Sequence, residues 1–216
     1  MHTSHTSASP ALALLVNAGG ASRRMGRNKA LLPVGDGVLV TYVLRRLRPL
    51  AQAGAVVVAN DPAVVAALRP EPSLQVVADR WPQGGALGGL ATGLALTPGW
   101  TLAVACDMPF VDAGLAGYLA TLARDDWDAV VPQSDGHAQV FHALYHPRCL
   151  PVLEANLRAG RLAVQAAFEQ LRVRWVCGGE LAAHQTTPDA FLNINTPQEW
   201  AAVQARLAGD KKQPEG

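Results

Sequence analysis

The chain alternates short apolar runs with longer amphipathic segments. The short runs predict buried strands at 11–16, 55–59, 74–78, 101–105 and 129–131. The longer segments predict helices at 38–50, 62–68, 88–96 and 113–122. The helix at 38–50 carries its apolar residues on one face: Val40, Val43, Leu44, Leu47 and Leu50. Regular alternation of strands and helices predicts an α/β fold with a mostly parallel twisted sheet, flanked by helices on both faces.

The second half of the chain is less regular. Its patterns predict a strand at 139–145, helices at 149–157 and 163–171, strands at 172–177 and 191–194, and a terminal helix at 196–207. Pro147 and the pair Gly178–Gly179 are interpreted as local breaks and not as linkers. We therefore expect one Rossmann-like domain over 11–208, with disordered tails at 1–10 and 209–216.

Polar residues follow several of the predicted strands. A glycine-rich loop comes after the first strand, and Asn60, Asp79 and Asp107 each come just after a later one. In parallel α/β sheets, ligands bind beyond the carboxyl ends of the strands. These four positions are therefore expected to meet at one rim of the sheet.

Composition narrows the function classes. Of 216 residues, 50% are hydrophobic and 16% charged, and the net charge of +1 gives no global basic field that would attract nucleic acid. The cationic character is local, at Arg23, Arg24, Arg27 and Lys29.

The cysteines and the N-terminal residues indicate the cellular compartment of the protein. The three cysteines are far apart and form no C-x-x-C, which argues against a disulfide framework and a cysteine-based zinc site. Residues 1–10 lack the positive start of a signal peptide, and no apolar run reaches the ~20 residues of a membrane helix. We expect a cytoplasmic protein with reduced thiols and no membrane partner.

The loop at 17–33 carries the strongest chemical signal. Adjacent glycines let backbone N–H groups approach an anion, and the arginines and lysine that follow neutralise it, so the loop predicts phosphate binding. A P-loop is excluded because five residues separate Gly20 from Gly26 and Ala30 follows Lys29. The G-x-G-x-x-G dinucleotide fingerprint does not occur.

This loop resembles the signature L-A-G-G-x-S-x-R-M-G-x-D-K-x-L-L of nucleotidyltransferases, which transfer a nucleoside monophosphate to a phosphorylated acceptor. The matching positions are Ala18, Gly19, Gly20, Ser22, Arg24, Met25, Gly26, Lys29, Leu31 and Leu32. Asn17 stands where Leu is usual and Asn28 where Asp is usual. The resemblance implies the nucleotide-diphospho-sugar transferase type of fold. It also implies that Asn17, Ala18, Gly19 and Gly20 bind the nucleotide, while Arg24 and Lys29 act in catalysis.

Asp107 lies in a second motif, Cys-Asp-Met-Pro-Phe-Val, directly after a predicted strand. One interpretation is a helix N-cap. The other is a ligand of Mg²⁺, which is commonly held by one or two carboxylates together with substrate phosphates. The same family carries C-D-x-P-[FY]-[IV] with its Asp on the metal, which implies that Asp107 is the catalytic metal ligand and that Mg²⁺ is the cofactor.

A third, glycine-rich motif spans 84–90 and resembles the family's G-P-L-A-G, with Ala86 for Pro and Gly88 for Ala. Such a turn allows a base or ribose to lie against the backbone, or a helix to pack closely on a sheet. The resemblance implies that Asp79 and Asn60 contact the nucleotide. A turn role for Asp79 remains open, as does Val58 in place of Asn60.

The fourth motif, at 191–200, contains Asn193 and Asn195 before Thr196 and Pro197. A capping box explains Thr196, Pro197 and Glu199 but not the two asparagines, which share one face if 191–194 is a strand. Molybdenum cofactor guanylyltransferases especially carry N-[IV]-N-T-P near the C-terminus, which implies that both asparagines bind the pterin acceptor. Arg161 resembles, a residue or so early, an arginine of the family that suits the acceptor phosphate.

The resemblance spans about 12–208 and implies a nucleotidyltransferase reaction, in which GMP passes from GTP to molybdopterin cofactor and pyrophosphate leaves. Implied partners are GTP, molybdenum-bearing molybdopterin, and the insertion partners or molybdoenzymes that receive the product. Three alternatives stay open: a cytidylyltransferase on the same cofactor, a sugar-1-phosphate nucleotidyltransferase, and a nucleotide sensor without catalysis. The departures at Asn17 and Asn28 support the sensor, because the loop loses its usual carboxylate.

Overall fold

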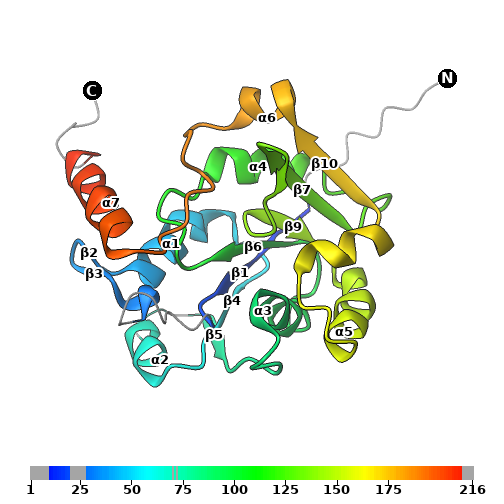
Figure 1. Cartoon of the computed structure of the whole chain (residues 1–216), viewed down its shortest axis with the longest axis horizontal. Helices are drawn as coiled ribbons and strands as arrows, with labels where there is room; N and C mark the ends of the chain where they lie inside the picture. The colour runs from blue at the N-terminus through cyan, green and yellow to red at the C-terminus, as the bar shows by residue number, and fades with distance from the viewer. Residues whose placement is uncertain (1–9, 20–27, 70, 72, 211–216) are drawn as a thin grey trace.

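A central sheet organises the computed structural model, which describes residues 10–19, 28–69, 71 and 73–210 (Figure 1). The sheet has eight strands; seven follow the order β10-β7-β9-β6-β1-β4-β5 and β8 pairs with β7. Their bounds are β1 (Ala13–Asn17), β4 (Ala55–Val58), β5 (Leu74–Val77), β6 (Thr101–Ala105), β7 (Ala129–Ser134), β8 (His137–Ala138), β9 (Ala143–Tyr145) and β10 (Val173–Cys177). A separate hairpin consists of β2 (Pro33–Val34) and β3 (Gly37–Val38).

The sheet is mostly parallel, as the strand–helix alternation predicted. β1 runs parallel to β4 and β6, β5 parallel to β4, and β10 parallel to β7, whereas β9 is antiparallel to both β6 and β7. The register places Asn17 opposite Val58 on one side and Ala105 on the other. Three neighbouring strands therefore end level, and the loops that follow them leave from the same edge.

Helices connect the strands and cover both faces of the sheet. The α-helices are α1 (Leu39–Leu47), α2 (Pro62–Leu68), α3 (Gly85–Leu94), α4 (Ala113–Thr121), α5 (Leu150–Arg158), α6 (Gly178–His184) and α7 (Pro197–Asp210). The 3₁₀ helices are η2 (Lys29–Leu31), η3 (Arg48–Leu50), η4 (Pro147–Cys149) and η5 (Val164–Gln170). Within the described residues, none of these helices has the length and apolarity needed to cross a bilayer.

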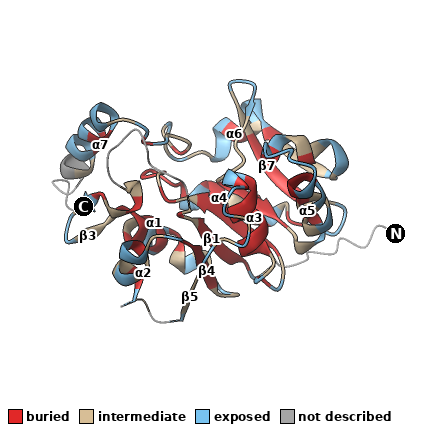
Figure 2. Ribbon diagram, turned by 60° about the horizontal axis from the view of Figure 1, so that its bottom comes forward, coloured by how far each residue is buried: buried red, intermediate tan, exposed pale blue. Residues whose placement is uncertain are grey.

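Alternation along the strands divides the core into two layers. On β1, Leu14 and Val16 join a cluster with α1, α4 and α7, while Leu15 packs on the other face with α3 and α5. Figure 2 shows the buried strands between these two helical layers. Each layer removes apolar surface from water, the dominant favourable term in folding. This α/β sandwich confirms the predicted fold class.

Some predicted elements differ in the structure. The strand expected at 191–194 is wrong: the segment is irregular, and the Ile194 N–H donates to the Asp107 carbonyl, 3.0 Å away, outside any ladder. The strand expected at 139–145 is broken, because His142 has a φ of 70°, which cannot continue a strand. The helix expected at 163–171 is the 3₁₀ helix η5. The Gly178–Gly179 pair opens the short helix α6 and is not simply a break.

Candidate functional site

The site begins where β1 ends. The Ala18 N–H donates to the Val58 carbonyl at 2.8 Å, and the Asn17 carbonyl accepts from the Cys106 N–H at 3.0 Å, so the first residues of the glycine loop are held on both sides. The Asn17 side-chain Oδ1 also accepts from the Gly19 N–H at 3.2 Å. The next two predicted residues, Gly20 and Arg24, lie outside the described residues.

Helix α3 packs closely against the start of this loop. A Cβ on Gly89 would lie 2.4 Å from Asn17 Oδ1, and one on Gly88 would lie 3.2 Å from Asp79 Oδ2. Only glycine therefore permits this approach. The glycine-rich motif at 84–90 packs helix to sheet, the second of its two interpretations, and sets the position of the Asn17 amide.

Lys29 links two of the predicted site residues. Its Nζ donates to Asp107 Oδ2 and to Asn195 Oδ1, each 2.9 Å away. The Lys29 and Asp107 side chains are 15% and 19% exposed, so the ion pair lies in a recess and remains accessible to solvent. Lysine from η2, aspartate from the loop after β6, and asparagine from the segment before α7 thus meet at one point.

The segment before α7 is held in place by hydrogen bonds that its backbone N–H groups donate. Its buried Ile194 donates to the Asp107 carbonyl, and Glu199 Oε2 accepts from the N–H groups of Asn195 and Thr196 at 2.5 and 3.1 Å. The Glu199 N–H donates to Thr196 Oγ1 at 3.2 Å, which confirms the predicted capping box.

Asn193 lies apart from this junction. Its Nδ2 donates to the Phe191 carbonyl at 3.1 Å, and its side chain is exposed. Without a strand at 191–194, the reason for placing both asparagines on one face disappears. Only Asn195 hydrogen-bonds Lys29 among the described contacts of this pair.

Asp79 and Asn60 form a neighbouring cluster at the same edge of the sheet. Asn60 Oδ1 accepts from the Asp79 N–H, and Asp79 Oδ1 accepts from the Trp81 N–H and the Thr92 hydroxyl, all at 2.8 Å. Asp79 therefore does stabilise a turn. Its second oxygen, Oδ2, faces Gly88 and Gly19 and so remains on the side of the glycine loop.

Asn28 caps η2 and pairs with a carboxylate that the sequence did not single out. Its Oδ1 accepts from the Ala30 N–H at 3.0 Å, and its Nδ2 donates to Asp61 Oδ2 at 2.9 Å. The hydrogen bond from Asn28, followed by one from the Ala63 N–H, lowers the pKa of Asp61. A carboxylate thus stands beside position 28 although Asn replaces the usual Asp.

Arg161 is held at the end of α5. Its Nε donates to Oδ1 of the buried Asn156 at 2.6 Å, and its N–H donates to the Asn156 carbonyl at 2.9 Å. Among the described contacts, none joins Arg161 to Lys29, Asp107 or Asn195. The alternative for Arg158, a solvated helix face, fits its ion pair with Glu154 at 2.7 Å.

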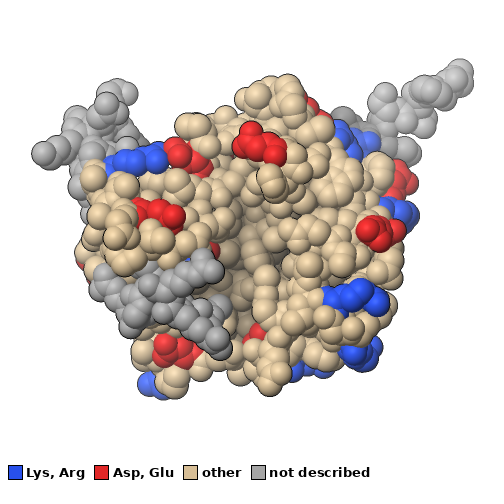
Figure 3. All heavy atoms as spheres, viewed as in Figure 1, with Lys and Arg blue, Asp and Glu red and all other residues tan. Residues whose placement is uncertain are grey.

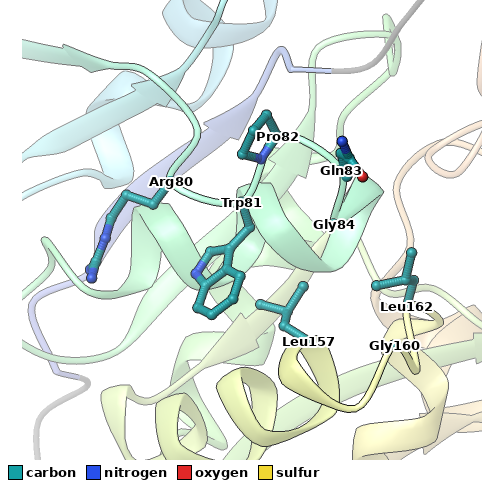
Figure 4. A pocket seen from close by; sticks show the side chains of 8 residues that line it. All are labelled: Arg80, Trp81, Pro82, Gln83, Gly84, Leu157, Gly160 and Leu162. Atoms are coloured by element: carbon teal, nitrogen blue, oxygen red, sulfur yellow. The ribbon is translucent and has the colours of Figure 1, made fainter.

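A pocket of about 420 Å³ lies between the N-terminus of α3 and the end of α5. Its lining residues are Arg80, Trp81, Pro82, Gln83, Gly84, Leu157, Gly160 and Leu162. The Trp81 indole and Leu157 lie next to each other in Figure 4, and the Arg158 guanidinium lies 5.8 Å from the centre of the Trp81 ring. The pocket therefore has an apolar wall, with Arg80 as the charged residue among those that line it.

Charge and shape limit what the site can do. Figure 3 shows the face hollowed near its centre, with most of the visible charged side chains toward the outer part of the face. Among the described residues, no three His, Cys, Asp or Glu side chains form a group that could hold a metal ion. Asp107 supplies one carboxylate, and a cationic ammonium already lies between its Oδ2 and the Asn195 oxygen. A divalent cation here would need phosphate oxygens as additional ligands.

Sequence reasoning missed Thr92 and Asp61. Asp61 had a signal, because an aspartate before Pro62 at the start of a helix is typical of an N-cap, and its Oδ1 accepts from the Ala63 N–H at 2.9 Å. Thr92 had none, because it lies in the middle of α3 and reaches Asp79 only through the packing of that helix on the sheet.

Comparisons with known proteins agree with this fold. The family model described as "MobA-like NTP transferase domain" matches residues 14–175. A "Probable molybdenum cofactor guanylyltransferase" of Pelotomaculum thermopropionicum is 34% identical over 91% of this chain and 92% of its own length. The molybdenum cofactor guanylyltransferase of Vibrio vulnificus is 28% identical over 86% of this chain and 91% of its own. The crystal structure of molybdopterin-guanine dinucleotide biosynthesis protein A from Archaeoglobus fulgidus has a TM-score of 0.79 at 24% identity and covers 92% of this chain and 100% of its own.

Proposed function

We propose that this chain, which belongs to the MobA-like NTP transferase family, transfers GMP from GTP to the terminal phosphate of molybdopterin cofactor. The family establishes a nucleotidyltransferase, and the names of its relatives support the guanylyl reaction. The observation that carries the proposal is the junction at Lys29, whose ammonium contacts both Asp107 and Asn195. One cation thus touches both the nucleotide side and the acceptor side of the predicted site.

The reaction needs little covalent chemistry from the protein. An anionic oxygen of the acceptor phosphate attacks the α-phosphorus of GTP, a new P–O bond forms, and the α–β phosphoanhydride bond breaks to release pyrophosphate with its electron pair. The nucleophile is already ionised, so no strong general base is required. Catalysis then consists of positioning and charge stabilisation.

The residues divide between the two substrates. The glycine loop at 18–20 holds the nucleotide phosphates in this proposal. The Ala18 N–H already donates to the Val58 carbonyl and the Gly19 N–H to Asn17 Oδ1, so the Gly19 N–H would exchange the Asn17 oxygen for a phosphate oxygen when the nucleotide binds. Asn60 and Asp79 lie at the nucleotide end of the same rim. Lys29, together with Arg24, neutralises charge as pyrophosphate leaves.

Asp107 is the metal ligand in this proposal, and the metal is Mg²⁺. The carboxylate of Asp107 is a hard oxygen donor that suits a magnesium ion held largely through phosphate oxygens. When bound, Mg²⁺ supplies Lewis-acid stabilisation of charge on the phosphate oxygens. The protein's own part is to keep Asp107 pointing toward Lys29.

The acceptor lies on the side of Asn195. Asn193 and Asn195 flank the buried Ile194 and supply amide groups to the pterin, and Arg161 supplies a cation at the end of α5. Reduced thiols at Cys106, Cys149 and Cys177, all within the described part of the chain, support a cytoplasmic enzyme. The molybdoenzymes that use the product are its downstream partners.

The sensor alternative loses part of its support. It rested on the departures at Asn17 and Asn28, but Asp61 brings a carboxylate within 2.9 Å of the Asn28 amide. The Asn17 amide in turn organises the loop through Gly19. Both departures are accommodated by the fold.

The decisive test is turnover with purified protein, Mg²⁺, molybdopterin and each of GTP, CTP and glucose-1-phosphate with a nucleotide. Pyrophosphate release and guanine dinucleotide formation with GTP support the proposal. A product formed from CTP supports the cytidylyltransferase alternative. A product formed from glucose-1-phosphate supports the sugar-1-phosphate nucleotidyltransferase. A nucleotide at ~100 times its Kd stabilises the fold by roughly 2.7 kcal/mol even without turnover. A thermal shift with GTP but no pyrophosphate release therefore indicates the sensor and not the enzyme.

A further inference from the structure

The acceptor side is carried by an irregular segment, residues 185–196, which joins α6 to α7 and which we call the strap. It delivers Asn195 to Lys29. Irregular segments lack a ladder of their own hydrogen bonds, so their position depends on ties to the rest of the fold. Two such ties lie at opposite ends of the strap, and both lead to the loop between β6 and α4.

The first tie is the carboxylate of Asp112, which is 1% exposed. Its Oδ2 accepts from the Thr186 and Thr187 N–H groups at 2.5 and 3.2 Å, and its Oδ1 accepts from the Thr186 hydroxyl at 2.8 Å. A Cβ on Gly114 would lie 2.7 Å from Thr186 Cγ2, so a glycine in α4 makes room for the strap.

The second tie is the hydrogen bond from Ile194 to the Asp107 carbonyl. Asp107 and Asp112 belong to the same short loop, so this loop and the strap run side by side and are joined at both ends. Such a double attachment fixes where Asn195 lies relative to Lys29 and to the Asp107 carboxylate.

A buried histidine supports the middle of the strap. The ring of His142, which is 0% exposed, packs edge-on against Phe191 with the ring centres 5.7 Å apart. Its Nε2 lies 3.1 Å from the Asp112 carbonyl. The strap is thus supported by the residue just before β9 as well as by the β6–α4 loop.

We propose that Asp112 is a positioning residue of the transfer reaction, and that by holding Thr186 and Thr187 it places Asn195 for the acceptor. This inference rests on the proposed function. Capping α4 alone would use one acceptor, the 2.9 Å bond from the Leu115 N–H. The other three hydrogen bonds of the carboxylate all go to the strap.

The test compares Asp112→Asn with Leu119→Ala. Asn keeps one oxygen for the helix cap but opposes its NH₂ group to the strap N–H donors. Leu119 is a buried residue of α4 that makes no described hydrogen bond to the strap, and its truncation lowers stability by leaving a cavity. We expect Asp112→Asn to raise the KM for molybdopterin by roughly 10-fold or more while the Kd of Mg·GTP changes little. Leu119→Ala lowers stability with both constants near wild type.

A second pair isolates the strap contact. Thr186→Val removes the hydroxyl that donates to Asp112, and Thr186→Ser keeps it. We expect only the valine variant to weaken acceptor use. Hydrogen exchange of the Ile194 amide adds a readout without substrates: it should speed up in Asp112→Asn and Thr186→Val beyond the change in global stability, and not in Leu119→Ala.

The outcomes are distinguishable from failure of the proposed function. If wild-type protein makes no dinucleotide, the function fails, and Ile194 exchange still reports on whether Asp112 holds the strap. If Asp112→Asn and Leu119→Ala change acceptor KM and Ile194 exchange alike for equal losses of stability, Asp112 is only a structural cap and the inference is wrong.

Discussion

The Lys29 ammonium lies 2.9 Å from Asp107 Oδ2 and at the same distance from Asn195 Oδ1. These residues come from three separate parts of the chain, and the contact places a cation between an anionic oxygen and an amide oxygen. A substrate phosphate entering the recess would compete for this ammonium. In the proposed site, Lys29 would therefore be the residue that contacts both substrates.

Replacing Asp107 with Asn should lower kcat/KM by a factor on the order of 10²–10³, because the site loses its carboxylate where charge must be stabilised. Thermal stability should fall by only a few degrees, since a partly exposed ion pair contributes about 0–1 kcal/mol. Steady-state kinetics at saturating magnesium and calorimetry measure the two effects. Activity near wild type would contradict the metal assignment.

Lys29→Ala should act differently from Asp107→Asn. The substitution removes the cation that neutralises the triphosphate, so its loss should appear mainly as a higher KM and Kd for the nucleotide. Isothermal titration with Mg·GTP measures this directly. Arg45→Ala, which removes an exposed ion pair with Glu71, is the matched control for loss of one cation; if it weakens nucleotide binding equally, the effect of Lys29 is not local.

Asn28→Asp restores the residue that the family pattern carries, yet we expect it to destabilise this protein. The new carboxylate would face Asp61 Oδ2, which now accepts from the Asn28 amide at 2.9 Å. The hydrogen bond that lowers the pKa of Asp61 would be replaced by repulsion. The melting temperature should be lower than that of wild type at pH 7, and this difference from wild type should shrink toward pH 4 as one carboxyl gains a proton. The double variant Asn28→Asp with Asp61→Asn should recover at both pH values; equal losses in both variants would exclude repulsion as the cause.

The central strands could be predicted from the sequence because they are continuous apolar runs. Such runs are expected where helices cover both faces of a sheet. It also brought Lys29, Asp107 and Asn195 into one site through a motif resemblance, before any contact was known. The strap was not predictable. Its course depends on Asp112 and on the single backbone hydrogen bond from Ile194 to Asp107, and neither leaves a periodic pattern. The acceptor role of Arg161, which the family resemblance implies, stays a prediction; in the structure its Nε donates to Asn156 Oδ1.

Gly89→Ala should destabilise the fold and disturb the glycine loop. A Cβ there would overlap Asn17 Oδ1 at 2.4 Å, which forces the amide away from Gly19, so we expect a loss of about 1–3 kcal/mol together with weaker GTP binding. Urea unfolding and nucleotide titration measure both. Gly117→Ala in α4 is the matched control, because a Cβ there meets nothing within 4 Å and alanine favours a helix. Adding Asn17→Ser should restore part of the stability; no recovery would place the clash elsewhere.

The buried His142 should make the fold sensitive to mild acid. Burial lowers its pKa from 6.5 to about 4, an effect that the neighbouring Asp112 only partly offsets. Between these two pH values the unfolded chain binds a proton at His142 that the folded chain does not bind. The contribution of the neutral histidine to the free energy of unfolding is therefore fully present above pH 6.5 and decreases as the pH drops toward 4. The loss reaches up to about 3 kcal/mol across that window. Urea unfolding from pH 8 to pH 4 measures the slope for wild type and for His142→Asn, in which asparagine tolerates the positive φ. The variant should be less stable at pH 8 and show a flatter dependence, whereas an unchanged slope would mean that another group causes the acid sensitivity.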